Sequence, residues 1–539
     1  MSDKTHTPKK ATPSIAIIGC GLGGIAAAVK LRKAGIESFT IFERQSGPGG
    51  VWWQNRYPGL GVDVPSHLYS FSFKPHDWSR THAMRDELLG YAQEVIDENR
   101  LAGHIHFNVT VERVSWDDDL HEYTLTFADG ATATADVVIC AAGLFHTAKY
   151  PTWPGLDMFS GETIHTAHWE GDYRLEDKRI AIVGTGATSI QLVPALSKIA
   201  GHVYVFQREP GWAIARGDRD FSEAERARNR RPGMARLNRM RMYWRFERLI
   251  IGMRKIRPNK SRLQVVAETY IDSILADHPE LKAAVTPRYP FPGKRPLFDA
   301  GFYRALTEPN VTLVPRAVDR VTETSVVDVG GGDWPVDVLI FATGFNVGDY
   351  LGTLTVIGRG GRSLHEFWEG EPTGFLGITV PGFPNFYMLY GPNTNGGGSL
   401  LVQLERQAEY AVKAIQRMAK EGITAIEPTG WAYRIWDEYL RWRNSKQVYA
   451  ISNNYYKASS GKVLTEWPGT MTEYLVLTRS LGRICSAAWT SHARPPRTGR
   501  PPELRLGQSE AEEIGAVEGA TSVDGRDAQA AAEGIGEGR

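Results

Sequence analysis

The sequence predicts an α/β fold with two Rossmann-like domains and a helical insertion. An apolar strand, a glycine-rich turn, a helical stretch and a second apolar strand follow one another twice, and the two copies lie 165 residues apart. A short apolar strand that ends in small residues also occurs twice, once after each copy. A charged segment of helical composition follows the second copy. Strands that alternate with helices are typical of parallel sheets covered by helices.

The first copy consists of the strand Ile15–Ile18, the turn Gly19–Gly24, a helical stretch and the strand Phe39–Phe42. In such a turn the first glycine makes a tight bend, the second lets the backbone approach a pyrophosphate, and the helix N-terminus offers free N–H groups. Glu43 ends the second strand, and its carboxylate can accept hydrogen bonds from both ribose hydroxyls. We therefore predict that a dinucleotide without a 2′-phosphate, FAD or NAD, binds at Gly19, Gly21, Gly24 and Glu43.

The second copy follows the strand 180–183, and its turn is formed by Gly184, Thr185, Gly186, Ala187, Thr188 and Ser189. Arg208 lies 24 residues after the first glycine of this turn, the offset of Glu43 in the first copy. A carboxylate there would repel a 2′-phosphate, whereas a guanidinium binds it through two parallel charge-assisted hydrogen bonds. The sequence therefore predicts FAD at the first copy and NADPH at the second. Two copies in matching contexts disfavour glycine-rich turns without a ligand.

The repeated short strands set the expected domain boundaries. Residues 136–143 and 337–344 are each an apolar strand followed by a small-residue turn, and continuous apolar strands are typical of the buried centre of a sheet. We interpret each as the last strand of its domain, after which the chain crosses to the other domain. The expected domains are an FAD-binding domain of residues 1–150 and 346–492 and an NADPH-binding domain of residues 151–214 and 288–345.

Residues 215–287 form the predicted helical insertion, and residues 493–539 form a predicted disordered tail. From residue 231 to 260 there are ten Lys or Arg residues and one Glu, with aromatic and aliphatic residues between them. Such a segment can touch an acidic membrane surface. It can also be a solvated helical layer whose apolar face covers the active site, which is the interpretation we favour. The tail has too few large apolar residues to offset the entropy of ordering.

The overall composition argues against several classes of protein. A formal net charge of +1 gives no indication of a nucleic-acid partner. The three cysteines show neither a redox pair nor a zinc spacing, which predicts buried thiols, no metal site and a reducing compartment. The polar N-terminus and the lack of a run of about 18 apolar residues predict a cytoplasmic protein without a transmembrane segment. We expect a monomer or a weak oligomer.

Three further stretches contain residue types that are suited to chemistry. They are Gly49-Gly50-Val51-Trp52 with the following Tyr57-Pro58-Gly59 and Asp63, the segment from Phe159 to Trp169, and the pair Lys294-Arg295. Taken alone, each also has a structural explanation: a turn, a linker that contains histidines, and one basic pair among 62 Lys and Arg residues.

Together these stretches resemble the Baeyer–Villiger monooxygenases, a class that carries both nucleotide-binding folds on one chain. The family signature F-x-G-x-x-x-H-x-x-x-W matches Phe159, Gly161, His165 and Trp169, just before the second glycine-rich turn. A longer family pattern matches the first stretch at Gly49, Gly50, Trp52, Tyr57, Pro58, Gly59 and Asp63. The resemblance covers roughly residues 14–480. It departs from the family at Glu170, and at residues 454–457, where relatives often have a tryptophan that contacts NADPH.

The resemblance implies an enzyme that reduces its FAD with NADPH, forms a C4a-peroxyflavin with O₂ and converts a ketone to an ester or lactone. It implies catalytic roles for Arg295, whose guanidinium would stabilise negative charge beside the flavin, and for Asp63, which would pair with Arg295. Lys294 would join Arg208 on the 2′-phosphate. His165 and Trp169 would couple rotation of the NADPH-binding domain to flavin chemistry rather than donate protons.

The resemblance also extends the expected FAD site. A turn at residues 397–400 opens a helix, and its backbone N–H groups would face the flavin. The residues added to the FAD site are Val51, Trp52, Asp63, Tyr69, Val111 and Leu400. The expected cofactors are therefore FAD and NADPH, and the expected partners are O₂ and a small-molecule ketone. Aromatic residues in the insertion favour a bulky apolar ketone, but the sequence does not identify it.

Three alternative functions can be separated from this one. The nearest is a flavin monooxygenase that oxidises nitrogen or sulfur atoms of small molecules, whose signature resembles residues 159–165 but lacks the tryptophan found here as Trp169. A flavin disulfide reductase would need a cysteine pair near the first turn, and the sequence has none. A nucleotide-binding sensor that has lost oxygenation would have no need of Arg295 and Asp63. Measuring NADPH consumption with and without a ketone would distinguish such a sensor.

Overall fold

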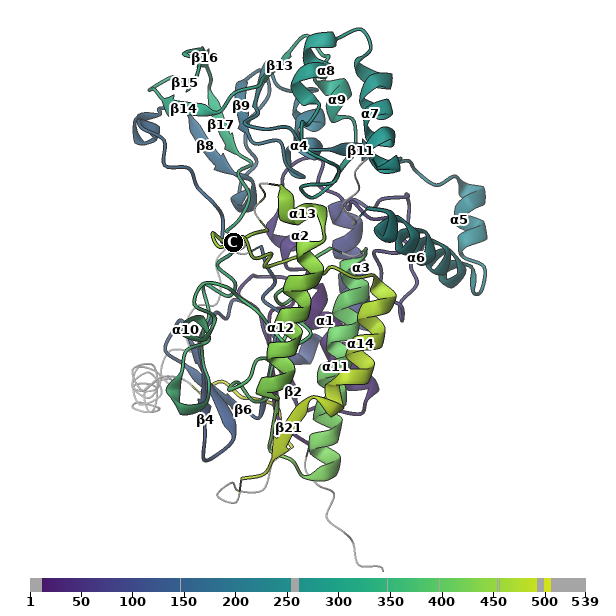
Figure 1. Cartoon of the computed structure of the whole chain (residues 1–539), viewed down its shortest axis with the longest axis vertical. Helices are drawn as coiled ribbons and strands as arrows, with labels where there is room; N and C mark the ends of the chain where they lie inside the picture. Colours follow the sequence, from purple (N-terminus) through teal and green to yellow (C-terminus); the bar gives the residue numbers. More distant parts are fainter. Residues whose placement is uncertain are drawn as a thin grey trace, which may run out of the picture.

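The computed structural model describes residues 12–145, 147–253, 261–346, 348–396, 398–452, 454, 456–491 and 499–505. Its two largest sheets each have five strands, and every pairing within them is parallel. They lie in separate halves of the molecule (Figure 1). Two parallel sheets accompanied by helices confirm the predicted α/β fold with two Rossmann-like units.

The first sheet has the strand order β19-β7-β1-β2-β3. All residues of β1, β2, β7 and β19 are buried, as expected for apolar strands covered by helices. Since β19 comes from chain beyond the second sheet, the first sheet combines two distant parts of the sequence. Its strands are β1 (Ile15–Ile18), β2 (Phe39–Phe42), β3 (Ile105–His106), β7 (Val137–Cys140) and β19 (Phe386–Met388).

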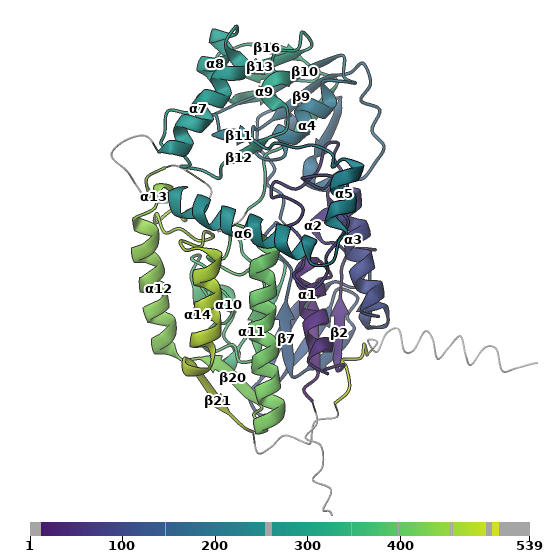
Figure 2. The same cartoon turned by 90° about the vertical axis from the view of Figure 1, so that its right-hand side faces the viewer.

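Long helices pack beside the first sheet. Helix α1 starts directly after the first glycine-rich turn and packs along α11, while α11 and α14 run side by side (Figures 1 and 2). The helices of this half are α1 (Leu22–Lys33), α2 (Val51–Gln54), α3 (Arg85–Glu98), α10 (Leu364–Trp368), α11 (Leu400–Glu421), α12 (Gly430–Ser445), α13 (Val448–Ile451), α14 (Met471–Ile484) and the short 3₁₀ helices η1 (Ala102–His104) and η4 (Arg359–Gly361).

Two smaller sheets complete this half of the molecule. One has the strand order β18-β4-β5-β6, and the other is the antiparallel pair of β20 with β21. The strands are β4 (Val111–Asp117), β5 (Glu122–Phe127), β6 (Thr132–Ala135), β18 (Thr355–Ile357), β20 (Ala425–Pro428) and β21 (Ser486–Trp489).

The second large sheet has the strand order β13-β10-β9-β17-β8. Helix α4 follows the second glycine-rich turn and packs on α9, and a three-stranded antiparallel sheet lies in the same half. The elements are β8 (Glu162–His165), β9 (Arg179–Val183), β10 (His202–Phe206), β13 (Val311–Val314), β14 (Val318–Val321), β15 (Ser325–Asp328), β16 (Asp333–Pro335), β17 (Val338–Phe341), α4 (Ser189–Leu196), α9 (Phe302–Ala305), η2 (Leu156–Met158) and η3 (Thr166–His168).

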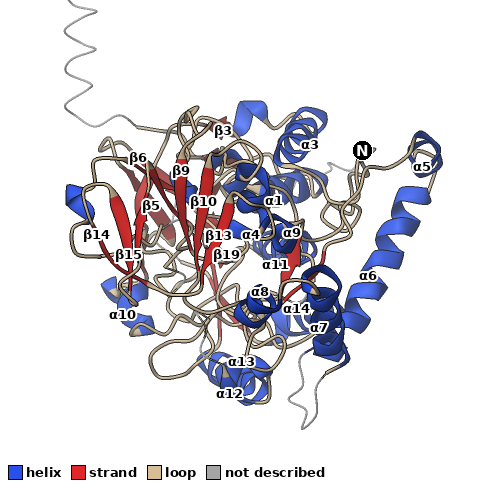
Figure 3. Ribbon diagram, turned by 90° about the horizontal axis from the view of Figure 1, so that it is seen from above, coloured by secondary structure: helices blue, strands red, loops and turns tan. Residues whose placement is uncertain are grey.

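The segment predicted as an insertion is helical, and its helices α5 and α6 lie between the halves, whereas α7 and α8 pack with the second half (Figures 1 and 2). Helix α6 crosses the face of the molecule in Figure 2 and runs along its edge in Figure 3. None of the helices in the described ranges combines the length and apolar character needed to cross a bilayer. The elements are α5 (Glu223–Asn229), α6 (Met234–Met253), α7 (Arg262–Leu275), α8 (Pro279–Val285) and the parallel strand pair β11 (Ala213–Ala215) and β12 (Leu297–Asp299).

Residues 499–505 differ from the prediction that the chain is disordered from residue 493 onward. Thr132 and Arg505 exchange two backbone hydrogen bonds of 2.9 and 2.7 Å, and the Thr40 hydroxyl donates to the Pro502 carbonyl at 2.8 Å. Backbone pairing with the edge strand β6 therefore holds this segment, and such pairing does not require large apolar side chains. The rest of the predicted tail, residues 493–498 and 506–539, lies outside the described residues.

Candidate active site

The first glycine-rich turn is held by close backbone contacts that leave no room for a side chain at Gly19 or Gly24. Gly19 has a positive φ of 99°, and a Cβ there would lie 2.8 Å from the Ala141 carbonyl oxygen. A Cβ on Gly24 would lie 2.0 Å from the carbonyl oxygen of Gly19. Gly24 therefore lets α1 start close to β1, and Gly21 stands at the N-cap of that helix, whose N–H groups face the turn.

Glu43 lies at the end of β2 with its carboxylate fixed by the backbone. Its Oε2 accepts a hydrogen bond from the Cys20 N–H at 2.6 Å, and its Oε1 accepts one from the Gln45 N–H at 2.8 Å. The side chain is only 5% exposed, and this burial raises the pKa of its carboxyl above the ordinary value. Each oxygen keeps a lone pair for a further donor, such as a ribose hydroxyl.

A cavity of about 690 Å³ extends from this turn. Trp52 and Tyr69 meet in its wall, where the Trp52 Nε1–H donates to the Tyr69 hydroxyl at 3.2 Å. Gly24 does not reach the cavity, because it packs against the strand. The other residues predicted for FAD all line it, namely Gly19, Gly21, Glu43, Val51, Trp52, Asp63, Tyr69, Val111 and Leu400. Of the turn predicted before Leu400, Gly397 lies outside the described residues.

The second glycine-rich turn borders another cavity, of about 720 Å³. Gly184 has a φ of 112°, and a Cβ there would lie 2.5 Å from the Ala342 carbonyl oxygen. Ser189 is fully buried, and its hydroxyl donates to the Gly184 carbonyl at 2.6 Å, so it supports the turn and does not line the cavity. The predicted NADPH residues that do line it are Gly184, Thr185, Gly186, Ala187, Thr188, Arg208 and Lys294.

The two predicted phosphate ligands differ in their present contacts. Lys294 forms an ion pair with Glu209 and lies over the ring of Tyr289. Arg208 is exposed and forms no ion pair within the described part of the chain. Arg208 can therefore accept an anionic group directly, whereas Lys294 would have to exchange one anion for another.

Asp63 and Arg295 come from the two halves of the molecule and form an ion pair. The Arg295 Nη2 group donates to Asp63 Oδ2 at 3.0 Å, across 232 residues of sequence. Both side chains line both cavities, so the pair stands where the two cavities meet. Asp63 is 14% exposed and Arg295 is 40% exposed, which leaves the guanidinium accessible from the cavities.

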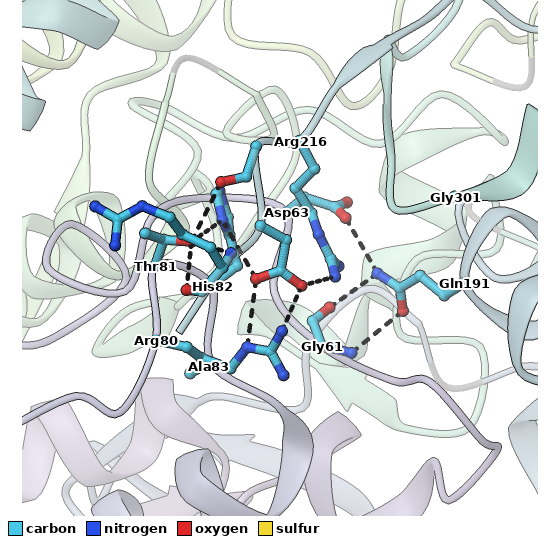
Figure 4. A network of polar contacts seen from close by, with 12 residues as sticks. Gly61, Asp63, Arg80, Thr81, His82, Ala83, Gln191, Arg216 and Gly301 are labelled. Carbon is cyan, nitrogen blue, oxygen red and sulfur yellow. Dashed lines mark hydrogen bonds and ion pairs between the residues drawn. The ribbon is translucent and has the colours of Figure 1, made fainter. Parts of the chain in front are cut away.

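Gln191 also holds Asp63, although Gln191 is not among the site residues predicted from the sequence. From α4, its Nε2 group donates to the Gly61 carbonyl at 2.9 Å and to Asp63 Oδ1 at 3.2 Å, while its Oε1 accepts from the Gly61 N–H at 3.3 Å (Figure 4). Gln191 is 6% exposed. The available signal was a glutamine inside the otherwise apolar run of α4, since a buried amide requires partners.

A second polar network joins the same halves (Figure 4). Arg80 donates two hydrogen bonds to Asp218, at 3.3 and 2.9 Å, and Arg216 donates to the same carboxylate at 2.5 Å. His82 lies beside it, and burial lowers the pKa of this imidazole to about 4. Among the residues that the structure describes, Arg216 keeps two buried guanidinium nitrogens, Nε and Nη1, without a hydrogen-bond partner. These contacts fasten the start of the insertion to the loop at residues 79–83.

The four signature residues Phe159, Gly161, His165 and Trp169 support the second sheet instead of lining the cavities. A Cβ on Gly161 would lie 2.5 Å from the Asp337 carbonyl oxygen, and Phe159 packs on an apolar cluster of this half. His165 ends β8, is 3% exposed, and its Nδ1 accepts a hydrogen bond from the Ala167 N–H at 3.1 Å. Burial lowers the pKa of His165 to about 4, so the ring is neutral near pH 7. Trp169 is buried in the core of the second half.

Two further segments close the first cavity. Phe246, Leu249 and Ile250 of α6 form an apolar part of its wall. Tyr449 and Tyr456 line it from the C-terminal region. In the stretch where relatives often have a tryptophan, Tyr455 lies outside the described residues, and the Asn454 side chain donates to the Gly293 carbonyl at 3.2 Å, just before the Lys294–Arg295 pair.

The three cysteines carry no redox function that the described structure can support. Cys20, Cys140 and Cys485 are all buried and free. Burial raises the pKa of each thiol, so the reactive thiolate is disfavoured. Cys20 lies in the first turn, and it has no cysteine partner there for disulfide exchange.

Comparisons with known proteins place this geometry in context. Residues 16–245 match the family model described as pyridine nucleotide-disulphide oxidoreductase. A Baeyer–Villiger monooxygenase of Streptomyces coelicolor is 37% identical over 472 residues, which is 86% of this chain and 90% of that protein. A Baeyer–Villiger monooxygenase of Pseudomonas aeruginosa is 35% identical over 471 residues, 86% of this chain and 89% of that protein.

Solved structures give the same result at the level of the fold. The closed crystal structure of a cyclohexanone monooxygenase is 27% identical, with a TM-score of 0.79 over 89% of this chain and 100% of that chain. The structure of an oxidized steroid monooxygenase bound to NADP is 27% identical, with a TM-score of 0.77 over 88% of this chain and 99% of that chain.

Proposed function

The chain belongs to the Baeyer–Villiger monooxygenase family, and we propose that its reaction takes place beside the Asp63–Arg295 pair. It is an FAD-containing, NADPH-dependent enzyme that uses O₂ to insert one oxygen atom next to a ketone carbonyl, giving an ester or lactone. The observation that carries the proposal is that this pair borders both nucleotide cavities at once. A cation at that point can act on groups bound in either cavity.

The residues around the first cavity fit FAD. A Cβ on Gly50 would lie 3.0 Å from the Gly21 Cα, so only glycines leave this gap open for a pyrophosphate. Glu43 would accept hydrogen bonds from the ribose hydroxyls, and Trp52, Tyr69 and Leu400 would pack beside the cofactor. Bound flavin, once reduced by NADPH, supplies the activated oxygen that enters the ketone.

The residues around the second cavity fit NADPH. The turn at Gly184–Ser189 would hold the pyrophosphate against the start of α4, as the first turn would at α1. Arg208 would bind the 2′-phosphate, and Lys294 would leave Glu209 to join it. Glu209 would keep Lys294 near the site when NADPH is absent, because its carboxylate attracts the ammonium group.

Arg295 would stabilise the negative charge that moves onto the former carbonyl oxygen during the reaction. A guanidinium keeps its proton at every relevant pH, so it can supply this charge without a change of protonation state. Asp63 accepts a hydrogen bond from Arg295, and Gln191 holds the other oxygen of Asp63. Asp63 and Gln191 are therefore positioning residues that set the direction of the Arg295 guanidinium. His165 and Trp169, which lie outside the cavities, would couple rotation of the NADPH-binding domain to the flavin reaction.

The ketone would bind near α6. Phe246, Leu249 and Ile250 face the first cavity, and an apolar wall of this kind favours bulky apolar ketones over small polar ones. Product analysis over linear, cyclic and aryl ketones, with an amine and a thioether in the same panel, would identify the substrate class. Esters or lactones from the ketones are expected, whereas oxidation of only nitrogen or sulfur would favour the alternative function.

The domain assignment is part of the proposal. Residues 1–150 and 346–492 would form the FAD-binding domain, since β19 pairs with β7 in the first sheet. Residues 151–214 and 288–345 would form the NADPH-binding domain, with residues 215–287 as the insertion. A cytoplasmic enzyme would fit the three buried free thiols, and we propose that it works as a monomer or weak oligomer.

The decisive experiment is the substitution Arg295→Ala. Ester formation should fall by about 100-fold or more, the scale of losing one charge-stabilising group, while FAD binding should persist because the variant leaves the first turn intact. Arg316→Ala is the matched control, because Arg316 also lines the second cavity but pairs with Asp328, away from Arg295. Gas chromatography would follow the ester and stopped-flow absorbance the flavin. Near wild-type ester formation by Arg295→Ala would refute the proposal.

A further inference from the structure

A third cavity, of about 880 Å³, lies at the opposite end of α11 from the flavin cavity. It is bordered by the C-terminal half of α11, by α14, and by β20 and β21, which lie together at the base of the molecule (Figure 2). Leu400 starts α11 at the flavin cavity and Arg417 borders the third cavity, so about 25 Å of helix separates the two. None of the residues that line the third cavity lines either nucleotide cavity.

The floor of this cavity contains a buried phenol without a partner. Tyr387 comes from β19 and is 1% exposed, and its hydroxyl forms no hydrogen bond in the described structure. Burial raises the pKa of this phenol well above the ordinary value, so it stays a neutral donor. Tyr410 lies next to it, with ring centroids 6.3 Å apart. A buried donor without an acceptor costs free energy, so its presence at a cavity indicates a missing acceptor.

The rim of the cavity is positively charged. Five cationic residues line it against Glu421 and Glu427, and they are Lys413, Arg417, Lys420, Arg479 and Arg483. Arg417 uses its Nε–H on Glu421 at 2.9 Å, while Nη1 makes only a 3.4 Å contact with Ser486. Lys420 forms no ion pair within the described ranges. The positive charge of Arg417 acts on the Tyr387 phenol, and both side chains border the cavity, so one ligand in this space can meet both.

Part of the remaining wall is apolar. Ile36, Ala414, Ile426 and Pro428 border the same space. An apolar wall beside a phenol and a guanidinium matches an amphipathic molecule with an anionic end. A planar carboxylate can accept one hydrogen bond from a guanidinium and another from a hydroxyl at once.

We propose that this third cavity binds a small amphipathic carboxylate, whose anionic end is held by Tyr387 and Arg417 and whose hydrocarbon part packs on Ile36, Ala414 and Ile426. The site is independent of the flavin reaction, because no residue is shared between them. A ligand there would stabilise the packing of α11 against α14, and α11 reaches the flavin cavity at Leu400.

The test uses the FAD-loaded full-length protein and octanoate as the probe, with octanol as the neutral control. Octanoate should bind once per chain in calorimetry and should raise the Tm in a saturable way, as expected for a ligand of the folded state. Octanol should bind at least tenfold more weakly. Since octanoate could also enter the ketone site, Arg295→Ala should be measured in parallel and should retain the octanoate effect.

Two variants locate the binding. Tyr387→Phe and Arg417→Met should each weaken octanoate binding at least tenfold. Without octanoate, Tyr387→Phe should keep or raise the Tm, because it removes only a buried hydroxyl that has no partner. Should Tyr387→Phe fail to fold, Arg417→Met still tests the site. The proposal is overturned if octanoate does not bind, if octanol binds equally well, or if both variants bind octanoate normally. It is also overturned if the Tm of Tyr387→Phe falls without octanoate, since the hydroxyl would then already have a partner, such as an internal water.

Discussion

In each nucleotide turn, the fifth residue after the opening glycine lies against the carbonyl oxygen of that glycine. The two turns differ in the kind of contact that is made there. In the first turn a Cβ on Gly24 would lie 2.0 Å from the Gly19 oxygen, so only hydrogen fits there. In the second turn the Ser189 hydroxyl donates to the Gly184 oxygen at 2.6 Å. Helix α1 begins three residues after its opening glycine and α4 begins five residues after, which leaves space for the serine.

This difference shows that one sequence fingerprint covers two kinds of turn. At this fifth position the first turn has no room for a side chain, which suits a cofactor that stays bound. At the same position the second turn has Ser189, and replacing this serine can weaken its hydrogen bond to Gly184 without a steric clash. The following predictions test whether the two turns respond differently, in order of decreasing effect.

Gly24→Ala should have the largest effect. The added methyl group would meet the Gly19 carbonyl, so α1 must move away from β1, and overpacking of this kind typically costs about 1–3 kcal/mol. We expect the purified variant to lose FAD and its yellow colour, and to show a lower Tm. Gly186→Ala is the matched control, because a Cβ there meets no atom within 4 Å. A yellow Gly24→Ala protein with normal Tm would contradict the contact.

Arg208→Ala should come next and should affect only the second site. The loss of a charged hydrogen bond to the 2′-phosphate costs roughly 1.5–3 kcal/mol, so the KM for NADPH should rise about tenfold or more while the KM for NADH stays nearly constant. Lys294→Met should give a smaller increase, because Lys294 already shares its charge with Glu209. Equal losses for both coenzymes would mean that Arg208 does not bind the phosphate. Steady-state NADPH and NADH oxidation would measure this.

Ser189→Ala should have a moderate effect. It removes the hydrogen bond to Gly184 and leaves that partly buried carbonyl short of one donor, at a cost of about 1 kcal/mol. Urea unfolding should show the loss, and NADPH binding should weaken only slightly. Ser189→Gly restores the full glycine fingerprint but adds backbone freedom, so it should be no more stable than Ser189→Ala. If Ser189→Ala unfolds at the wild-type urea concentration, the hydroxyl does not hold the turn.

Replacing His165 should have the smallest effect on the two turns at neutral pH and should change only the stability in acid. Burial lowers the pKa of His165 to about 4, so between its ordinary value near 6.5 and about 4 the unfolded chain binds a proton that the folded protein does not. Stability is therefore fully present above about pH 6.5 and falls as the pH drops toward 4. His165→Gln should make this fall less steep in Tm measurements from pH 7.5 to 5. His82, with a pKa of about 4, has the same sign and remains in the variant. If the Tm of the wild type and of His165→Gln fell with pH at the same slope, His165 would not be buried in its neutral form.

Local patterns predict both glycine turns, and the structure has a buried strand before each of them. The same patterns predict Glu43 and Arg208 as nucleotide ligands, because each lies at a fixed offset from a strand and a turn, and these two roles stay predictions. The Asp63–Arg295 pair was predicted from the family resemblance, since 232 residues separate the two side chains. Gln191 was missed because its partners are on a loop 128 and 130 residues away, and nothing in α4 marks that loop. The order of residues 499–505 was missed because backbone pairing leaves no trace in composition.

The position of β19 has a consequence for how the chain is made. During synthesis β1, β2, β3 and β7 emerge first, but the neighbour of β7 on its open side is not made until residue 388. The whole second sheet leaves the ribosome in the meantime and can fold as a continuous unit. The apolar edge of β7 stays uncovered for that interval, and exposed edges of this kind attract other nascent chains. Premature termination between the two parts of the first sheet should therefore give an aggregating product rather than a working half.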